Sequence, residues 1–281
     1  MQDNQREERL QTKIGSLPEG KDKTGREHNM RIAVITGASS GMGREFVKQV
    51  GHFYQNLDEI WVIARRADRL EELDTCSKIP LRIIAGDLLH QQVYKDLRRE
   101  LTESQPDIRM LVNAAGFGKS GTVEEILEED WKSQLQMVDL NCMSLSRMTF
   151  ICLPYMRAGS RILNLASAAA FCPQAGFAVY AATKSYVLSF SRGLGAELKK
   201  RGIYVTAVCP GPVDTEFFEV SGALEDPLKK LTLVQACDVV RKALLDSRKR
   251  KSVSVYGISM KAARAGAKLL PHEMILRILS K

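Results

Sequence analysis

The feature that most constrains the fold of this 281-residue chain is an alternation of short apolar runs and longer helical stretches from residue 31 onward. The apolar runs end in glycine-containing or polar turns, which is typical of buried parallel strands. They lie at 31–36, 59–64, 81–85, 110–113, 161–166, 204–209 and 252–256. Alternation of this kind predicts one doubly wound α/β domain, with a central parallel sheet of about seven strands and helices on both faces. Ligands of such sheets bind beyond the carboxyl ends of the strands.

The first 29 residues differ from the rest of the chain. They carry six positive and six negative side chains and show no apolar period. A segment of this composition has little to bury, so we expect a mobile extension at 1–29 and one domain at 30–281. The longest helical stretches within that domain are predicted at Trp131–Met156 and Ala178–Lys200, with a further helix at Leu231–Leu245.

The net charge of +8 is concentrated at the C-terminal end. From Arg241 onward eleven Lys or Arg side chains stand against Asp246 and Glu273, a net charge of +9. Nucleic-acid binding would need a basic groove with interleaved aromatic residues, so no nucleic-acid partner is expected. The pattern favours a solvated basic face, and a docking surface for an anionic partner or a membrane is the alternative.

The six cysteines form no C-x-x-C pair and share no metal spacing with histidine, so no metal site is expected. Scattered cysteines in apolar surroundings indicate buried, reduced thiols in a cytoplasmic protein. The N-terminus has no apolar core of the kind found in signal peptides. Residues 162–182 are apolar, but Asn164, Ser167, Pro173 and Gln174 argue against a membrane-spanning helix.

A glycine-rich turn follows the first predicted strand directly. The sequence Thr36-Gly-Ala-Ser-Ser-Gly-Met-Gly43 has the spacing G-x-x-x-G-x-G and leads into a helix. Glycines let the backbone approach a phosphate, and the helix that begins there points free N–H groups at the anion. The turn is therefore a candidate dinucleotide site, with contacts expected from Gly37, Ser39, Ser40, Gly41, Met42 and Gly43.

The end of the second strand indicates which dinucleotide is bound. Sites that prefer NAD place an acid there to hold the ribose 2′-hydroxyl. This chain instead has Ala64 followed by Arg65 and Arg66. Guanidinium groups pair with phosphate in a bidentate manner, so the two arginines favour NADP(H).

Two further strand ends carry candidate cofactor contacts. Asp87 and Leu88 follow the third strand, where a carboxylate can accept a hydrogen bond from the adenine amino group or cap the next helix. Asn113, Ala114, Ala115 and Gly116 follow the fourth strand. Small residues there let the backbone approach a flat ligand, although a tight turn alone would also need them.

Tyr180 and Lys184 are the candidate catalytic pair. Their spacing of four puts both side chains on one helix face. A nearby ammonium and a cationic nicotinamide favour the phenolate, which would bring the phenol into range as a general acid/base. Ser167 ends the strand thirteen positions before Tyr180, where a hydroxyl can hydrogen-bond the reacting oxygen.

Taken together, these motifs resemble the short-chain dehydrogenase/reductase family over residues 31–256, most of the chain. The resemblance depends on T-G-x-x-x-G-x-G at 36–43, N-A-A-G at 113–116, Asn141, Ser167, Y-x-x-x-K at 180–184 and the run Pro210–Thr215. Each motif is weak alone, and their order and spacing make the assignment specific. Two departures are mild: Met42 stands where the family usually has Ile, and Ala114 replaces the second Asn of N-N-A-G.

The resemblance implies a role for each matching residue. Tyr180 would be the acid/base, Lys184 would lower its pKa and hold the nicotinamide ribose, and Ser167 would polarise the carbonyl. Asn141 would anchor a water that links Lys184 to solvent. Cofactor contacts would also come from Pro210, Gly211, Val213 and Thr215.

The predicted function is hydride transfer between NADP(H) and a carbonyl or alcohol carbon. Phe217 and Phe218 lie where this family has a lid over the substrate, and they suggest an apolar substrate such as a hydroxysteroid or a 3-oxoacyl group. The alternatives are a non-catalytic NADP(H) sensor or scaffold, and an adaptor that uses the basic C-terminus for peripheral membrane contact.

A homodimer or homotetramer is also expected. In this family the two long helices form the interface, and here both carry more apolar residues than one face against a sheet requires. They are Leu135, Val138, Leu140, Met143, Leu145, Met148, Phe150 and Ile151 in the first helix, and Tyr186, Val187, Leu188, Phe190 and Leu194 in the second.

Overall fold

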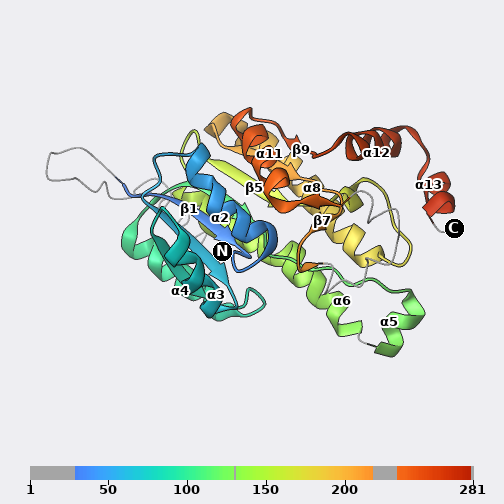
Figure 1. Cartoon of the computed structure of the whole chain (residues 1–281), viewed down its shortest axis with the longest axis horizontal. Coiled ribbons are helices and arrows are strands. Elements are labelled where there is room, and N and C mark those ends of the chain that lie inside the picture. Colours follow the sequence, from blue (N-terminus) through green and yellow to red (C-terminus); the bar gives the residue numbers. More distant parts are fainter. Residues whose placement is uncertain (1–28, 130, 218–232, 280–281) are drawn as a thin grey trace, which may run out of the picture.

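The computed structural model describes residues 29–129, 131–217 and 233–279. The extension predicted at 1–29 therefore lies outside the described residues, apart from residue 29. From residue 31 onward the chain alternates between strands and helices, as the apolar runs predict (Figure 1).

A parallel sheet runs through the middle of the described chain (Figure 1). Its strand order is β3-β2-β1-β4-β5-β6-β9, and each described pair of neighbours is parallel. The strands are β1 (Arg31–Thr36), β2 (Glu59–Ala64), β3 (Leu81–Ala85), β4 (Asp107–Asn113), β5 (Arg161–Leu165), β6 (Tyr204–Val208) and β9 (Val253–Ser254). This arrangement confirms the predicted doubly wound sheet of seven strands among the described residues.

Helices connect the strands and cover both faces of the sheet. They are α2 (Gly41–Phe53), α3 (Ala67–Cys76), α4 (Gln91–Ser104), α5 (Val123–Glu129), α6 (Trp131–Val138), α7 (Leu145–Cys152), α8 (Ala178–Leu198), α11 (Ala236–Arg248), α12 (Ile258–Leu269) and α13 (His272–Leu279). The helix predicted at Leu231–Leu245 corresponds in part to α11, which begins only at Ala236, after a short strand at Val234–Gln235, and ends three residues later than expected.

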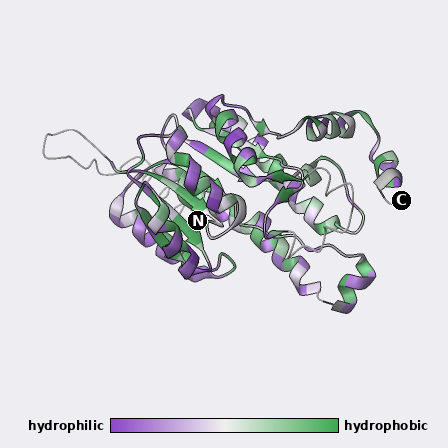
Figure 2. Ribbon diagram, in the orientation of Figure 1, coloured by the Kyte–Doolittle hydropathy of each residue, from purple (hydrophilic) through white to green (hydrophobic). Residues whose placement is uncertain are grey.

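The strands are apolar on both sides, so the sheet builds two hydrophobic cores. In β1, Ala33 and Ile35 face α2 and α11, whereas Ile32 and Val34 face α4, α7 and α8. Figure 2 shows the same division, with apolar strands between helices that carry their polar residues outward. Burial on both faces explains why the strands read as continuous apolar runs rather than alternating ones.

The strand order reverses between β1 and β4, which opens a crevice at their carboxyl ends. Thr36 and Asn113 end these two strands and lie in register. The Oγ1 of Thr36 accepts hydrogen bonds from the backbone N–H groups of Ala114 and Ala115, at 3.1 and 3.2 Å. One buried hydroxyl thus joins the turn after β1 to the turn after β4.

The helical stretch predicted at 131–156 is interrupted. A π-helical turn, Asp139–Ser144, separates α6 from α7, and a 3-10 turn, Leu153–Tyr155, follows α7. Single π turns inside helices occur frequently at functional sites. Periodicity alone predicts a regular helix here, because a one-residue insertion in the turn leaves the apolar pattern almost unchanged.

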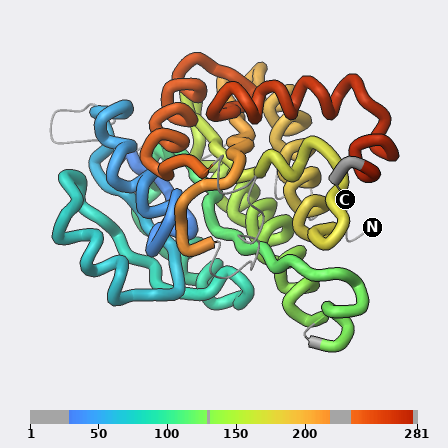
Figure 3. Tube along the Cα trace, turned by 45° about the vertical axis from the view of Figure 1, so that its right-hand side comes forward, coloured from blue at the N-terminus to red at the C-terminus, as the bar shows by residue number. Residues whose placement is uncertain are grey.

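The last two helices form a C-terminal arm, defined here as α12 and α13. The arm lies at the opposite end of the molecule from α3 and α4 (Figures 1 and 3). It contacts the 3-10 turn Ala168–Phe171, which follows β5. The arm thus places residues 258–279 beside the segment that connects β5 to α8.

The thiols are distributed differently from the prediction. Cys142, Cys152 and Cys209 are buried, as expected. Cys76, the last residue of α3, and Cys237, in the first turn of α11, are exposed. All six are free. In the part of the chain that the structure describes, no helix has the length and apolarity needed to cross a bilayer.

Candidate active site and dinucleotide cradle

The glycine turn after β1 depends on the absence of side chains. Gly37 has a φ of +67°, and a Cβ there would lie 2.8 Å from the backbone nitrogen of Ala115. A Cβ on Gly43 would lie 2.1 Å from the carbonyl oxygen of Gly37, which is closer than any real contact. Only glycine lets the start of α2 pack this closely against the turn.

The N-terminus of α2 is prepared for an anion. Ser40 is the N-cap, its side chain makes no capping hydrogen bond, and no acidic residue stands in the first turn. The first N–H groups and the positive end of the helix dipole are therefore not neutralised by a carboxylate of the helix itself. A dinucleotide phosphate fits this cradle.

A cluster of cations lies beside this turn. The guanidinium of Arg66 has two nitrogens 3.4 Å from the Oγ of Ser39, and Arg69 stands one helical turn further along α3. Both arginines pair with the carboxylate of Glu216. Arg65, which the sequence also suggests, is exposed. Sequence reasoning missed Arg69, although its i, i+3 spacing from Arg66 is a usable signal.

Asp87 and Leu88 lie after β3, at the same edge of the sheet. The Oδ1 of Asp87 accepts from the backbone N–H of Leu89 at 2.9 Å, so Asp87 stabilises its own turn, and His90 is the N-cap of α4. Leu88 is buried, and its carbonyl oxygen accepts hydrogen bonds from the hydroxyls of Tyr94 and Ser144.

The turn after β4 sits between the glycine turn and the helices of the other face. Asn113 donates to Asn164 Oδ1 at 2.8 Å and to Thr149 Oγ1 at 3.2 Å. A Cβ on Gly116 would lie 2.7 Å from Asn141 Oδ1 and 3.5 Å from Lys184 Nζ. Gly116 therefore lets this backbone approach the predicted catalytic residues.

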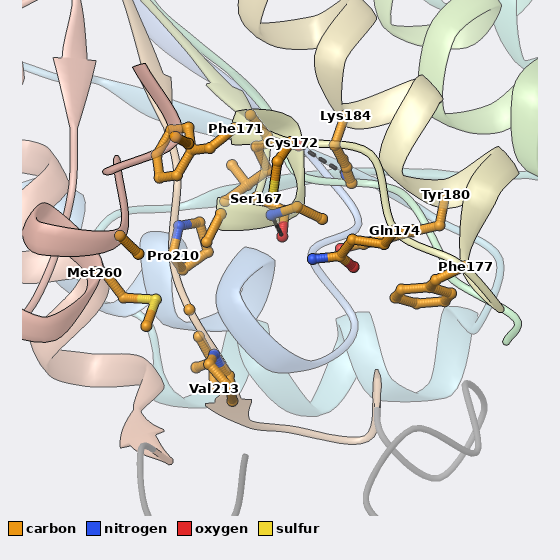
Figure 4. Close-up of a pocket in the computed structure, with 18 of the residues that line it drawn as sticks. Ser167, Phe171, Cys172, Gln174, Phe177, Tyr180, Lys184, Pro210, Val213 and Met260 are labelled. Carbon is orange, nitrogen blue, oxygen red and sulfur yellow. Dashed lines mark hydrogen bonds between the residues drawn. The ribbon is translucent and has the colours of Figure 1, made fainter. Parts of the chain in front are cut away.

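Ser167 and Tyr180 come together from separate elements. Ser167 lies two residues after the end of β5 and caps the 3-10 turn that follows. Its Oγ accepts a hydrogen bond from the N–H of Ala169 at 3.1 Å. Tyr180 lies in the first turn of α8, where the Ser167 hydroxyl is close enough to its phenol to lower the pKa. Both side chains line one cavity, shown in Figure 4.

Lys184 is buried one turn beyond Tyr180 on α8 (Figure 4). Its Nζ donates to the carbonyl oxygen of Leu165 at 2.8 Å and lies 5.6 Å from the centre of the Tyr180 ring. Burial lowers the pKa of Lys184 to about 8. An amine with this pKa exchanges its proton readily near neutral pH.

The chain's own groups do not lower the pKa of the phenol, and the predicted lowering also included the charge of a bound nicotinamide. Burial raises the pKa of Tyr180 to about 12, and the nearby Ser167 hydroxyl opposes this only in part. The ammonium of Lys184 is directed at the Leu165 carbonyl rather than at the phenol oxygen. The chain's own groups therefore keep Tyr180 protonated, which is the form that donates a proton.

Asn141 occupies the π-helical turn between α6 and α7. Its Nδ2 donates to the Phe117 carbonyl oxygen at 2.9 Å and to Thr183 Oγ1 at 3.1 Å, and its Oδ1 accepts from the Phe117 N–H at 3.1 Å. These bonds hold the turn after β4 against α8. Asn141 therefore lies beside Lys184, as the resemblance implies.

The run Pro210–Thr215 crosses the same edge of the sheet. The carbonyl oxygen of Pro210 accepts from the N–H of Ala168 at 2.7 Å, next to Ser167. A Cβ on Gly41 would lie 3.4 Å from Thr215. This run also contains β7 (Val213–Asp214), which pairs with β8 (Val234–Gln235). Residues 210–215 thus connect the glycine turn to the cavity.

The cavity has a volume of about 570 Å³ and is largely apolar. Phe177 stacks on Tyr180 with ring centroids 4.3 Å apart, and Phe217 lies 5.5 Å from Tyr180 on another side. The C-terminal arm supplies a further part of the wall, with Met260, Ala263, Ala267, Leu270 and Ile275. Sequence analysis identified Phe217, whereas Phe218 lies outside the described residues.

Sequence reasoning missed the contributions of Phe171, Phe177 and the arm, because no local pattern signals contacts between segments that are distant in the chain. Within the described ranges, no three His, Cys, Asp or Glu side chains converge as metal ligands would.

Comparison with known proteins gives a consistent picture. The family model described as short chain dehydrogenase matches residues 31–225. Serine 3-dehydrogenase of Rhizobium radiobacter is 33% identical over 66% of this chain and 72% of its own length. Very-long-chain 3-oxoacyl-CoA reductase of Anas platyrhynchos is 31% identical over 73% of this chain and 66% of its own length.

Among solved structures, a short-chain dehydrogenase from Sphingobium yanoikuyae in complex with NADPH superposes with a TM-score of 0.71. It is 26% identical, and the match covers 85% of this chain and 94% of that one.

Proposed function

The chain belongs to the short-chain dehydrogenase family, and from this premise we propose that it is an NADP(H)-dependent oxidoreductase that interconverts a carbonyl and an alcohol. The observation that carries the proposal is that Ser167 and Tyr180 line the same cavity wall, with Lys184 buried one helical turn beyond Tyr180. The glycine cradle lies at the same edge of the sheet.

The bound nicotinamide would supply or accept the hydride, and the chain would handle the proton. In the direction of reduction, Tyr180 donates its phenolic proton to the carbonyl oxygen. The Ser167 hydroxyl donates a hydrogen bond to the same oxygen and so stabilises the charge that develops there. Lys184, with its lowered pKa, is suited to return a proton to the phenolate, through the region that Asn141 holds in place.

The choice of NADP(H) over NAD(H) is supported by the cations after β2. Ala64 ends the strand, so the strand end itself supplies no carboxylate to hold a ribose 2′-hydroxyl. Arg66 contacts Ser39 of the glycine turn instead, Arg69 shares the carboxylate of Glu216 with Arg66, and guanidinium groups suit a phosphate. The structurally similar protein from Sphingobium yanoikuyae is described in complex with NADPH.

The substrate proposed for this cavity is a neutral, apolar carbonyl compound or alcohol, of the hydroxysteroid or 3-oxoacyl type. Lys184 is the only charged side chain among the described residues of the lining, and its ammonium is bound to the Leu165 carbonyl. A small amino-acid substrate would leave its own charges without partners in this apolar space. Similarity to a very-long-chain 3-oxoacyl-CoA reductase agrees with an apolar substrate better than similarity to a serine dehydrogenase does.

A panel of carbonyl compounds, followed by the absorbance of the reduced nicotinamide, tests both claims. We expect consumption of NADPH with neutral cyclic or long-chain ketones and little with small carboxylates, sulfonates or amino acids of similar reactivity. Consumption only with the charged compounds would overturn the substrate class. Tight NADPH binding without turnover on any compound would favour a non-catalytic sensor.

We also propose that two copies of the chain associate through α6–α8. Leu135, Val138, Met143, Phe150 and Tyr186 are exposed on these helices, and Phe190 joins Phe150 and Tyr186 in an aromatic cluster. Several residues first expected at the interface, namely Leu145, Met148, Ile151, Val187 and Leu194, belong to the core instead. Light scattering that gave a mass near 31.3 kDa would refute the association.

A further inference from the structure

The two arginines beside the glycine turn already hold an internal carboxylate. Arg66 Nη1 lies 3.0 Å from one carboxylate oxygen of Glu216, and Arg69 Nη1 pairs with the other oxygen. Glu216 comes from a segment almost 150 positions away in the chain. Each of its two oxygens thus has a guanidinium partner, which is the arrangement that an anion held by two arginines adopts.

The carboxylate of Glu216 lies close to the glycine turn, because its partner Arg66 also contacts that turn. Arg66 contacts Ser39 of the glycine turn through Nε and Nη2, and it contacts Glu216 through Nη1. Hydrogen bonds from Arg69 and Arg66 lower the pKa of Glu216, so the carboxylate is charged at neutral pH. A full negative charge therefore lies where the 2′-phosphate of NADP(H) is proposed to bind.

The cluster is exposed enough for an incoming phosphate to reach it. The side chains of Arg66, Arg69 and Glu216 are 38%, 36% and 41% exposed. Ion pairs at such sites contribute little to stability, because water and salt screen them. A phosphate monoester carries up to two negative charges and three acceptor oxygens, so it is a stronger partner for two guanidinium groups than one carboxylate.

We propose that Glu216 is a cofactor-selectivity residue, an internal stand-in for the 2′-phosphate that NADP(H) must displace from Arg66 and Arg69. This inference rests on the proposed use of NADP(H). Without nucleotide, Glu216 neutralises the two arginines. NAD(H) has no 2′-phosphate, so its binding leaves the pairing in place and gains nothing from the arginines.

The same displacement would reach the substrate cavity. Glu216 stands between Thr215, which lines the cavity, and Phe217, whose ring lies 5.5 Å from that of Tyr180. Both neighbours are joined to Glu216 by the backbone, so a backbone movement that releases Glu216 from the arginines also moves the wall beside Tyr180.

The test compares Glu216→Gln with the wild type by calorimetric titration with 2′,5′-ADP, 5′-AMP, NADPH and NADH. Glutamine keeps the size of the side chain and removes its charge. We expect the two nucleotides with a 2′-phosphate to bind about three- to thirtyfold more tightly, the range that two exposed ion pairs allow. Affinities for 5′-AMP and NADH should stay within about twofold, below that range.

A matched control is Glu100→Gln, which breaks the ion pair between Arg82 and Glu100 at 2.8 Å, near the start of β3 and so at the opposite end of that strand from the cofactor edge. It should leave the affinities for all four nucleotides unchanged. In an Arg66→Ala/Arg69→Ala background, Glu216→Gln should have no further effect on 2′,5′-ADP binding. That result separates competition for the arginines from a general change in charge.

The outcomes distinguish this inference from the proposed function. If the wild type prefers 2′,5′-ADP to 5′-AMP but Glu216→Gln leaves that preference unchanged or weakens it, the stand-in role is wrong and the NADP(H) assignment survives. If the wild type shows no preference for the 2′-phosphate, both fail. Equal gains for all four nucleotides would indicate a nonspecific charge effect and would also overturn the inference.

Discussion

The two sides of this active site are built in different ways. The dinucleotide side consists of the turns after β1 and β4, where backbone groups and glycines lie at the surface, and of the arginine side chains that follow β2. The substrate side consists of side chains from the 3-10 turn, α8, the run 210–217 and the C-terminal arm. The first is made by short consecutive motifs, and the second is assembled from segments far apart in the chain.

The two sides differ in how strongly their function restricts the residues that can form them. A turn whose backbone must approach a phosphate can adopt few conformations, and a Cβ on Gly37 or Gly43 would meet steric conflict. An apolar wall needs only volume and shape, which many residue sets supply. We therefore expect the dinucleotide side to decide whether hydride chemistry is possible, and the substrate side to decide on which compound.

The largest predicted effect lies where the two sides meet. Tyr180→Phe removes the proton donor and keeps the ring that stacks between Phe177 and Phe217. We expect kcat to fall by about 10²- to 10⁴-fold, the usual value of a general acid, whereas the affinity for NADPH stays within about threefold. Steady-state kinetics and nucleotide titration on one preparation measure both. Activity within tenfold of the wild type would remove Tyr180 from the proton transfer.

The next effect tests the dinucleotide side. Gly43→Ala places a Cβ against the backbone of Gly37, so the turn must shift. We expect the affinity for NADPH to fall about ten- to a hundredfold, the equivalent of about 1–3 kcal/mol of backbone strain.

The matched control for this variant is Gly193→Ala. Gly193 lies within α8, and a Cβ there meets nothing within 4 Å. Alanine at that position should leave binding unchanged and should stabilise the helix by about 0.5–1 kcal/mol. Equal effects of the two alanines on NADPH affinity would contradict the account of the cradle.

A smaller effect is predicted on the substrate side. Met260→Ala removes apolar contact area from the cavity wall, so KM for the apolar ketone should rise about three- to tenfold. The affinity for NADPH and kcat should hardly change. Ile258→Ala is the control, because Ile258 is 85% exposed on the same helix and does not line the cavity. A change in NADPH affinity instead of KM would contradict the assignment of Met260 to the substrate side.

The smallest effect concerns stability. The pKa of Lys184 in the folded protein is about 8, below the value near 10.4 of a lysine in an unfolded chain. Between these pH values the unfolded state holds more protons, so the free energy of unfolding should rise with pH by up to about 1.4 kcal/mol per pH unit. Denaturant titrations at pH 7, 8 and 9 should show this slope in the wild type relative to Lys184→Met. Parallel curves would mean that Lys184 titrates normally.

The sheet and the three candidate catalytic residues could be predicted from the sequence. The seven strands follow from apolar runs that fill both sheet faces, and Ser167, Tyr180 and Lys184 lie together because a strand end and a helix start meet at one edge. Each of these inferences needs only local pattern plus the rules of parallel sheets.

The features that sequence reasoning missed depend on long-range geometry. The apolar period of 131–156 does not show the π-helical turn that holds Asn141, and nothing local places Met260 or Leu270 in the cavity. Burial of Tyr180 was also not apparent from the sequence, and it raises the pKa that the chain's own groups give the phenol. The spacing of residues in the sequence predicts which side chains share a helix face, but it does not predict how deeply those side chains are buried.

The most direct test of the central claim follows the hydride itself. Wild-type protein is incubated with NADPH deuterated at the transferable position of the nicotinamide, together with the ketone most active in the panel, and the alcohol is examined by mass spectrometry. The account predicts one deuterium on the carbinol carbon of the product, and no labelled product with Tyr180→Phe in the same time. Binding of the deuterated NADPH with no labelled alcohol from any ketone would contradict it and would leave a protein that binds the nucleotide without using it.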